Sequence, residues 1–488
     1  GVCAPTGSGK SVLAMLAGLV SGRRTIILTG TKALQDQYRE QFPDTVTDLR
    51  GARSYGCAVE PRISAEEGVC KLGYPCSCKD SGECAYWEAI RRARKSELVL
   101  TNYHCWLAHG KTGSLGEAQL LVLDEAHQAY DALCSFLAVE IEEQELTMVG
   151  LQRPETGNGA GDIVVWRSWG QGVVSRVRER LEALKGSVGG NTPSRAQARE
   201  MRVLARLHDS LISLRDSVGE WVVAARMGGW TITPLWPKDY TDRALVRGAG
   251  KVLLLSAFLT PKTMEMLGFR DRDRDRDRDR DWLEVPSAFP LANRMVLHIP
   301  TARANHRMDE YEMGLWVARI DQIIDGRKDR KGIIHTVSYK RQEQILSWSS
   351  NSDIMVIHQA RNIMQMVEMF KRAGPPLVLV SPSVHTGWDF PNSQCRYIII
   401  AKVPYPDTRE PLTAARTEAD KDWPSYHAMS VVVQAAGRGV RSQDDWCEVM
   451  VVDDDWGWFW PKNRRFAPKW FQEAVGVSRT IPEARSLT

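Results

Sequence analysis

The chain opens with a loop of small residues whose spacing suits the binding of phosphate, APTGSGKS at residues 4–11. Gly7 and Gly9 allow the backbone to turn so that successive N–H groups converge on an anion. The helix expected over residues 11–20 points its positive end at the same place. This pattern predicts a nucleotide-binding loop made by Thr6, Gly7, Ser8, Gly9, Lys10 and Ser11.

Two side chains of this loop supply the chemistry that a bound nucleotide and its Mg²⁺ require. Lys10 is expected to reach the β and γ phosphates, and the Ser11 hydroxyl is expected to coordinate Mg²⁺. The first position of the usual pattern is Gly, whereas this chain has Ala4. The alternative interpretation is a Gly/Ser turn with a chance lysine, so the motifs farther along the chain have to support the loop.

A second group of charged residues follows an apolar run. Residues 120–123 are all Leu or Val, which is typical of a strand buried on both faces, and the run ends in Asp124, Glu125, Ala126 and His127. Carboxylates at the carboxyl end of a parallel strand lie where open α/β sheets bind ligands. We expect Asp124 to hold Mg²⁺ through water and Glu125 to orient and polarise the attacking water.

A third group stands near the end of the chain, at residues 434–441. Gln434, Arg438 and Arg441 are spaced to project from one helix terminus. A planar guanidinium suits a γ-phosphate because it can stabilise the spread negative charge of phosphoryl transfer. A solvated basic helix end is the alternative interpretation of these arginines.

Half of the ten cysteines fall in one short segment that has little periodicity and cannot bury a core of its own. In a reducing compartment such a group binds metal more often than it forms disulfides. Four thiolates suit either zinc or an iron-sulfur cluster, so both metals stay open. The candidate ligands are four of Cys57, Cys70, Cys76, Cys78 and Cys84.

Length and charge limit the remaining possibilities. A chain of 488 residues should hold several domains, because single cores seldom grow past roughly 250–300 residues. The net charge of 64 − 60 = +4 requires a nucleic-acid partner to be held by a local groove. No apolar run is long enough to cross a membrane, and a cytoplasmic location is expected. The absence of an initial Met, in what reads as a strand, indicates that sequence precedes Gly1.

The elements that must position these groups alternate between strand and helix, which predicts two parallel sheets of the α/β class. The first α/β unit is expected at residues 1–50, 86–127 and 251–269, interrupted by a cysteine-rich insertion at 51–85 and a helical insertion at 128–250. A second unit is expected at 293–488. The strict Arg-Asp alternation inside 270–292 offers no apolar face and is expected to be an exposed loop.

The whole chain resembles the superfamily 2 helicases, and within them the XPD/DinG-like iron-sulfur DNA helicases. The phosphate loop, the DEAH turn and the Q-x-x-G-R-x-x-R turn occur in the family's order. Further stretches similar to family motifs are TGTKALQDQ at 29–37, CAY at 84–86, TNYH at 101–104, SAFL at 256–259, HTVSY at 335–339 and TGWDF at 386–390.

The resemblance implies two RecA-like motor domains that hydrolyse ATP with Mg²⁺, travel 5′ to 3′ on single-stranded DNA and split the duplex at the cysteine-rich insertion. It implies a [4Fe-4S] cluster and makes the helical insertion an arch beside the DNA path. Gln434, Arg438 and Arg441 would complete the ATP site from the second motor domain. The residues expected to couple hydrolysis to movement or to line the DNA path are Thr31, Lys32, His127, Ser256, Thr336 and Asp389.

Three features depart from the family pattern. Phe258 replaces a Thr and removes a hydroxyl from the coupling motif, and Thr386 stands where Glu is common. Five cysteines compete for four cluster positions: Cys57, Cys70 and Cys84 are the chosen ligands, and Cys76 and Cys78 cannot be separated.

The expected function is an ATP-dependent DNA helicase, a monomeric motor acting on single-stranded DNA and tailed duplexes in DNA repair or replication. The alternative is an ATP-regulated nucleic-acid clamp or remodeller that does not separate strands, which Phe258 keeps open. A nuclease is disfavoured because no further carboxylate cluster is found outside the ATP site.

Overall fold

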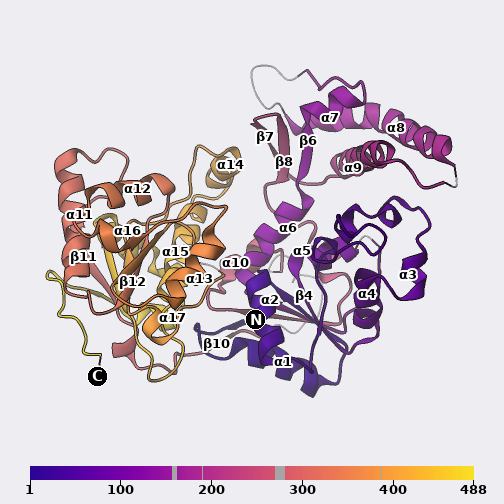
Figure 1. Cartoon of the computed structure of the whole chain (residues 1–488). Coiled ribbons are helices and arrows are strands. Elements are labelled where there is room, and N and C mark those ends of the chain that lie inside the picture. Colours follow the sequence, from indigo (N-terminus) through magenta and orange to yellow (C-terminus); the bar gives the residue numbers. More distant parts are fainter. Residues whose placement is uncertain (111, 156–161, 190, 270–280, 386, 488) are drawn as a thin grey trace.

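The computed structural model describes residues 1–110, 112–155, 162–189, 191–269, 281–385 and 387–487. Two α/β units lie side by side, and the segment between the DEAH turn and the last strands of the first unit rises above that unit (Figure 1). Thr386 and residues 270–280 of the Arg-Asp run lie outside the described residues, so the expectations for them have no structural counterpart.

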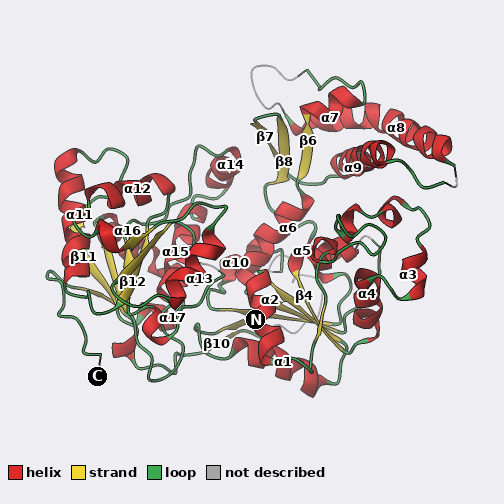
Figure 2. Cartoon of the chain, viewed as in Figure 1, coloured by secondary structure: helices red, strands yellow, loops and turns green. Residues whose placement is uncertain are grey.

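Within the described residues, seven parallel strands form the sheet of the first unit. The central strands consist of buried residues because helices cover both faces of the sheet (Figure 2). In spatial order the strands are β10 (Leu283–Glu284), β1 (Val2–Cys3), β9 (Lys251–Ser256), β5 (Leu120–Asp124), β2 (Thr25–Thr29), β4 (Leu98–Asn102) and β3 (Thr47–Asp48).

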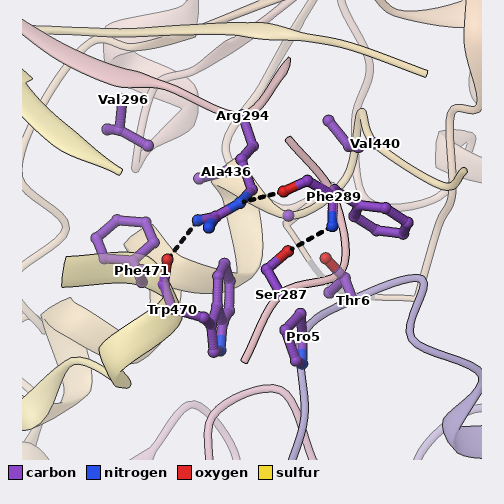
Figure 3. A pocket seen from close by; sticks show the side chains of 11 residues that line it. Pro5, Thr6, Ser287, Phe289, Arg294, Val296, Ala436, Val440, Trp470 and Phe471 are labelled. Atoms are coloured by element: carbon purple, nitrogen blue, oxygen red, sulfur yellow. Dashed lines mark hydrogen bonds between the residues drawn. The ribbon is translucent and has the colours of Figure 1, made fainter. Parts of the chain in front are cut away.

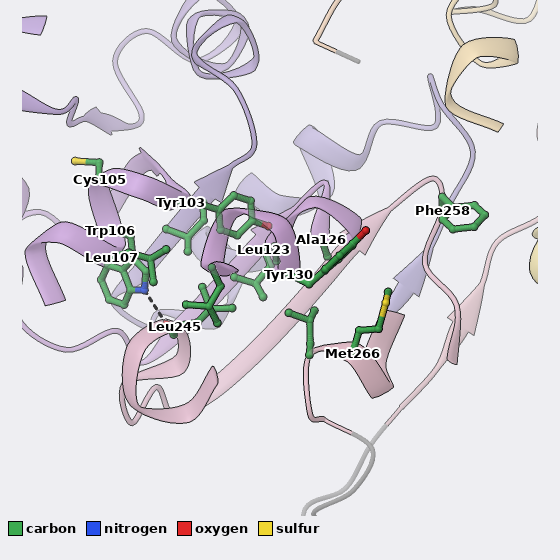
Figure 4. Packing of buried hydrophobic residues seen from close by; sticks show 14 of the residues in the cluster. Tyr103, Cys105, Trp106, Leu107, Leu123, Ala126, Tyr130, Leu245, Phe258 and Met266 are labelled. Atoms are coloured by element: carbon green, nitrogen blue, oxygen red, sulfur yellow. Dashed lines mark hydrogen bonds between the residues drawn. The ribbon is translucent and has the colours of Figure 1, made fainter. Parts of the chain in front are cut away.

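The helices of this unit follow the alternating pattern that the sequence predicts. They are α1 (Lys10–Ser21), α2 (Lys32–Gln41), α4 (Ala85–Lys95), α5 (Tyr103–Gly110), α6 (Ala129–Leu137) and α10 (Pro261–Met266). Between β3 and α4 the cysteine-rich segment forms only short pieces: η1 (Ala52–Ser54), η2 (Ala65–Glu67), η3 (Val69–Leu72) and α3 (Ser77–Ser81). Packing of this unit against the insertion at residues 128–250 is illustrated by the Trp106 indole, which donates to the Leu245 carbonyl at 2.7 Å (Figure 4).

The second unit also contains a parallel sheet, with seven strands among the residues that are described. Their spatial order is β13 (Met355–Val356), β14 (Leu377–Ser381), β12 (Lys331–His335), β15 (Tyr397–Ile400), β16 (Glu448–Asp453), β11 (Val296–Ala302) and β17 (Val475–Val477). The helices are α11 (Glu310–Asp325), α12 (Tyr339–Trp348), α13 (Ile363–Arg372), α14 (Pro411–Ala419), α15 (Trp423–Ala436), α16 (Asp455–Asn463) and α17 (Lys469–Gln472). The α/β class and the two parallel sheets are therefore confirmed.

The insertion at residues 128–250 is not helical throughout, and in this detail the sequence prediction is wrong. Besides α7 (Glu143–Met148), α8 (Ile163–Val188), α9 (Arg195–Arg215) and η5 (Thr241–Val246) it contains a small antiparallel sheet of β6 (Val139–Glu142), β8 (Gly229–Pro234) and β7 (Trp221–Arg226). A tight turn at Gly228, with φ of 82°, joins β7 to β8. The two strands are rich in β-branched and aromatic residues, which favour a hairpin. Within the described chain, no helix combines the length and the apolar character needed to span a bilayer.

A buried arginine joins α14 of the second unit to the first unit and its insertion. Arg416 is 4% exposed, and its Nε donates to the Leu235 carbonyl at 3.0 Å while Nη1 lies 3.2 Å from Asp131 Oδ1. Its guanidinium lies between three aromatic rings, with centroids at 5.2–5.5 Å. Because a desolvated cation gains from both ion pairing and aromatic faces, this contact should stabilise the boundary between the units.

Replacing Arg416 by Met should therefore lower stability. We expect a loss of about 2 kcal/mol, since a charged hydrogen bond and a desolvated cation–aromatic contact are each of that order, and a fall of roughly 4–8 °C in the melting temperature. Thermal unfolding measures the effect, and Arg409→Met is the matched control. Arg409 pairs with Asp407 at the surface, where its side chain is 89% exposed, and should change the melting temperature little. Equal melting temperatures for the two variants would contradict a stabilising role for Arg416.

Candidate functional site

The loop that joins β1 to α1 has the geometry of an anion cradle. Gly7 and Gly9 have φ of 75° and 81°, values that side chains with a Cβ rarely adopt. Gly9 is also the N-cap of α1, and no side chain among the described residues caps that helix end. The N–H groups of the first turn are therefore free to bind an anion, which the helix dipole favours.

The Lys10 ammonium lies over this loop. Its Nζ donates to the Pro5 carbonyl at 3.0 Å and to the Ala4 carbonyl at 3.4 Å. Burial lowers the pKa of Lys10, whereas the charges of Glu125 and Asp124 raise it. Ser8 closes the turn by donating its hydroxyl to the Pro5 carbonyl at 2.7 Å. Lys10 thus stands between the loop and the carboxylates of the DEAH turn.

Asp124 ends β5 and is buried, with defined partners on both carboxylate oxygens. Oδ1 accepts from the Glu125 N–H at 2.9 Å, and Oδ2 accepts from the Tyr38 hydroxyl at 2.7 Å. Burial and the neighbouring charge of Glu125 raise the pKa of Asp124 to about 6. The Tyr38 hydroxyl also interacts with Ser11, so the two residues predicted to hold Mg²⁺ are linked through one phenol.

The next residues turn the chain away from the sheet. Glu125 adopts a left-handed backbone conformation with φ of 51°, and its Oε2 lies 3.3 Å from His127 Nδ1. Burial raises the pKa of Glu125, but His127 and the charges of Lys10 and Arg438 hold it below its ordinary value. His127 Nδ1 is also 2.8 Å from the Ser256 hydroxyl at the end of β9. The predicted water-activating carboxylate and the predicted coupling residues therefore lie in one cluster of close polar contacts.

The second unit contributes two arginines that share one carboxylate. Arg438 Nη1 donates to Asp389 Oδ1 at 3.2 Å, and Arg441 pairs with the same oxygen. Arg438 also donates to the carbonyls of His385 and Trp388 at 2.8 and 2.9 Å and to Gln434 Oε1 at 3.1 Å. These bonds hold the Arg438 guanidinium in place. Asp389, which was predicted to lie on the coupling or DNA path, contacts both arginines.

The two halves of the site meet directly. A Cβ built on Gly7 would lie 3.3 Å from Arg441 Cα, and one built on Gly437 would lie 2.7 Å from Thr6 Oγ1. A cavity of about 20 Å³ beside this contact is lined by Pro5 and Thr6 of the loop, by Phe289, and by side chains of the second unit (Figure 3). It has room for about one water molecule, so the loop and the arginine turn are closely packed.

Three further predicted residues lie in different surroundings. Thr31 caps α2 by accepting from the Leu34 N–H at 3.2 Å, and its methyl lies 3.6 Å from the Cβ position of Gly387 in the second unit. Lys32 is exposed. Thr336 is fully buried and donates to the Ser338 carbonyl at 3.2 Å. Thr31 and Lys32 thus remain candidates for the DNA path, whereas Thr336 has a local hydrogen bond.

The five clustered cysteines are all free thiols, arranged as a trio and a pair. Cys78 Sγ lies 2.8 Å from Cys76 Sγ and interacts with Cys84, and burial together with these neighbours raises the pKa of Cys78 to about 12. Cys57 and Cys70 lie on either side of Gly68 in the sequence, and the sulfur of each is 3.5 Å from the point that a Cβ atom added to Gly68 would occupy.

Burial lowers the pKa of Lys71, whereas the charges of Cys70 and Cys84, one from the pair and one from the trio, raise it. Within the described chain, no three His, Cys, Asp or Glu side chains are arranged to hold a metal ion. The donor chemistry fits a thiolate-bound metal, whereas the observed side-chain positions do not form a closed site.

Two tyrosines of the site had no predicted role. Tyr38 is fully buried on α2, and no motif in the sequence distinguishes it from a core aromatic. Tyr103 lies inside the TNYH stretch, and its hydroxyl donates to the Asp124 carbonyl at 3.0 Å. Only Tyr103 carried a sequence signal, because it belongs to a stretch that resembles a family motif.

Comparisons with known proteins find two helicase domains in the chain. Residues 1–139 match the DEAD/DEAH box helicase family, and residues 322–474 match the helicase C-terminal domain. The chain is 23% identical to the ATP-dependent DNA helicase YoaA of Haemophilus influenzae over 29% of this chain, and the match spans about a third (32%) of that protein.

Solved structures share the fold. An XPD helicase superposes with a TM-score of 0.61 at 14% identity, covering 98% of this chain and 95% of that one. Xpd4 of S. tokodaii gives a TM-score of 0.56 at 14% identity with the same coverages. The architecture of two α/β units is therefore that of XPD-type structures.

The contact between Tyr38 and Asp124 yields a direct test. Replacing Tyr38 by Phe removes the hydroxyl that orients the carboxylate, so we expect ATP turnover to fall about tenfold and the Mg²⁺ concentration for half-maximal activity to rise, as for other groups that orient metal ligands. Magnesium titrations of ATPase activity measure both effects. Tyr103→Phe is the control, because that hydroxyl contacts the backbone of Asp124 and spares its carboxylate. Equal magnesium dependence in the two variants would refute an orienting role for Tyr38.

Proposed function

On the premise that this chain is an XPD/DinG-like helicase of superfamily 2, we propose that it hydrolyses ATP to translocate 5′ to 3′ on single-stranded DNA and to unwind duplexes. The observation that carries the proposal is the contact between the phosphate loop of one unit and the arginine turn of the other. A nucleotide bound at this boundary touches both units, so its hydrolysis can change their separation.

The site residues divide the reaction among themselves. The backbone of the loop and Lys10 bind the phosphates, while Ser11 and Asp124 hold Mg²⁺. Glu125 is kept ionised beside Lys10 and His127. It orients the attacking water toward the γ-phosphate and accepts a proton from that water. Arg438 and Arg441 stabilise the charge that develops during transfer, as arginines do in related phosphoryl transfers.

The choice of DNA rests on the curated relative, which is an ATP-dependent DNA helicase. Because the net charge is only +4, DNA would have to be held by a local groove and not by the surface as a whole. Single-stranded DNA and tailed duplexes are the proposed substrates. The proposal includes a monomeric motor that works in the cytoplasm in DNA repair or replication.

An ATP-regulated clamp without strand separation is the second candidate. Phe258 favours it, because a phenyl ring stands in the coupling motif where the resemblance implies a Thr hydroxyl. In such a clamp, ATP turnover would change the affinity for nucleic acid and no duplex would be opened.

For the cysteine-rich insertion we propose a [4Fe-4S] cluster, with zinc as the alternative. Cys57, Cys70, Cys84 and either Cys76 or Cys78 would be the ligands. The proposal is supported by five free thiols in one short segment and by Lys71, which lies near both the pair and the trio. Such a centre would hold together a segment that has little regular structure of its own.

Replacing Lys10 by Ala tests the motor. We expect DNA-stimulated ATP turnover and displacement of a tailed strand both to be lost, because the phosphates lose their cationic partner. Arg438→Ala should lower turnover about 10³-fold or more while retaining nucleotide binding. Lys328→Ala is the control and should retain activity, because Lys328 is a surface lysine that pairs with Asp325.

Three outcomes of these assays decide between the proposals. Full activity of Lys10→Ala would refute the motor. Wild-type ATP turnover without strand displacement would favour the clamp. Displacement from substrates with a 3′ tail and not from those with a 5′ tail would contradict 5′ to 3′ movement.

Anaerobic purification tests the metal. We expect brown protein with broad visible absorbance that disappears in Cys84→Ser, because the cluster loses a thiolate, and persists in Cys395→Ser, whose thiol is buried in the second unit. Separate Ser variants of Cys76 and Cys78 identify the fourth ligand as the one whose loss bleaches the protein. A colourless zinc-loaded protein would exclude the cluster and support zinc.

A further inference from the structure

Phe258 occupies the segment that leaves β9, apart from the group around Tyr103 and Trp106 (Figure 4). Its ring is fully buried. The neighbouring ring is that of Tyr426 in α15, with centroids 5.2 Å apart and planes tilted by 51°. The residue that departs from the family's coupling motif therefore makes an aromatic contact between the two motor domains.

A series of polar contacts connects Phe258 to the nucleotide site on one side. The Phe258 N–H donates to the Ser256 hydroxyl oxygen at 3.1 Å, and that oxygen is 2.8 Å from His127 Nδ1. The same nitrogen lies 3.3 Å from Glu125 Oε2. A movement of the water-activating carboxylate would therefore shift the backbone that carries the Phe258 ring.

On the other side, Tyr426 is held in two ways. Its hydroxyl forms a hydrogen bond of 2.7 Å with the Thr263 hydroxyl of α10, and its ring meets Phe466 edge-on at 6.1 Å. The helix that carries Tyr426 also carries Gln434, and Arg438 follows directly after its end. A displacement of Tyr426 would thus displace the arginine turn.

We propose that the Phe258–Tyr426 ring contact positions α15, and with it the arginine turn, against the nucleotide site, and so replaces the hydroxyl of the coupling motif. The inference rests on the proposed motor function and concerns the positioning of residues that act on ATP. A hydroxyl would link ATP hydrolysis to domain movement through one directional hydrogen bond. The buried ring pair links them through apolar surface that is removed from water only while the two domains are in contact.

The opposite interpretation is that Phe258 is a defective coupling residue, and one substitution separates the two. Phe258→Thr restores the family's hydroxyl and removes the ring. If the ring contact carries the coupling, this variant should unwind fewer base pairs per ATP than the wild type, by about five- to tenfold, with a KM for ATP within about twofold. If Phe258 is defective, unwinding by the variant should improve.

Further variants test which part of the pair matters. Phe258→Leu and Tyr426→Leu keep apolar side chains and should lose coupling to similar extents, with little added loss in the double variant because the same contact is removed. Tyr426→Phe keeps the ring and should retain most coupling. Phe459→Leu is the matched control, since Phe459 is fully buried against Tyr405 inside the second domain and should leave coupling unchanged.

Amide hydrogen exchange gives a readout that does not depend on unwinding. A non-hydrolysable ATP analogue should increase protection of α15 in the wild type and in Phe459→Leu, and should fail to do so in Phe258→Leu and Tyr426→Leu. The inference would be overturned if Phe258→Leu and Tyr426→Leu unwound as many base pairs per ATP as the wild type and showed the same protection of α15. If the wild type never displaces a strand, the helicase function fails, whereas hydrogen exchange still decides whether the ring contact positions α15.

Discussion

Charges of both signs from two separate sheets meet at the site. Lys10 belongs to the first unit, and Arg438 and Arg441 belong to the second. Burial lowers the pKa of Lys10, the charges of Glu125 and Asp124 raise it, and the two arginines lower it. A triphosphate adds negative charge beside these three cations, and in a site of low effective dielectric such attraction is strong. The closeness of the two domains and the occupancy of the site are therefore linked through the same charges.

The sequence predicted the contiguous motifs and the α/β class, and it did not predict the contacts between residues that are distant in the chain. The phosphate loop, the DEAH turn and the arginine turn are contiguous motifs, so each could be recognised before the chain was folded. The side chains that contact these motifs could not be recognised in the same way. Tyr38 is 86 residues from Asp124, and nothing in the local sequence indicates that this tyrosine donates a hydrogen bond to a distant carboxylate. Such contacts depend on register and packing, which a local pattern does not contain.

The scaffold shows the same division. Buried parallel strands such as β2 and β5 read as unbroken apolar runs and were predicted from them, because both faces are covered. The hairpin of β7 and β8 was missed since it follows long helices whose periodicity suggested a helical insertion. The edge strand β17, at Val475–Val477, is too short and mixed in character to carry a signal. This strand is defined by its parallel pairing with β11, which lies far away in the sequence.

Several contacts between the domains come from one short part of the second domain. Arg416 on α14 reaches Asp131 and Leu235, Trp423 meets Trp236 at 6.3 Å, and Tyr426 meets Phe258. Ten residues later the same helix ends beside the turn that touches the phosphate loop. Because α14 and α15 follow one another in the chain, a force on any of these contacts acts on a single packed unit. Coupling between the insertion, the ATP site and the second domain thus requires no long path, since one helical pair touches all three.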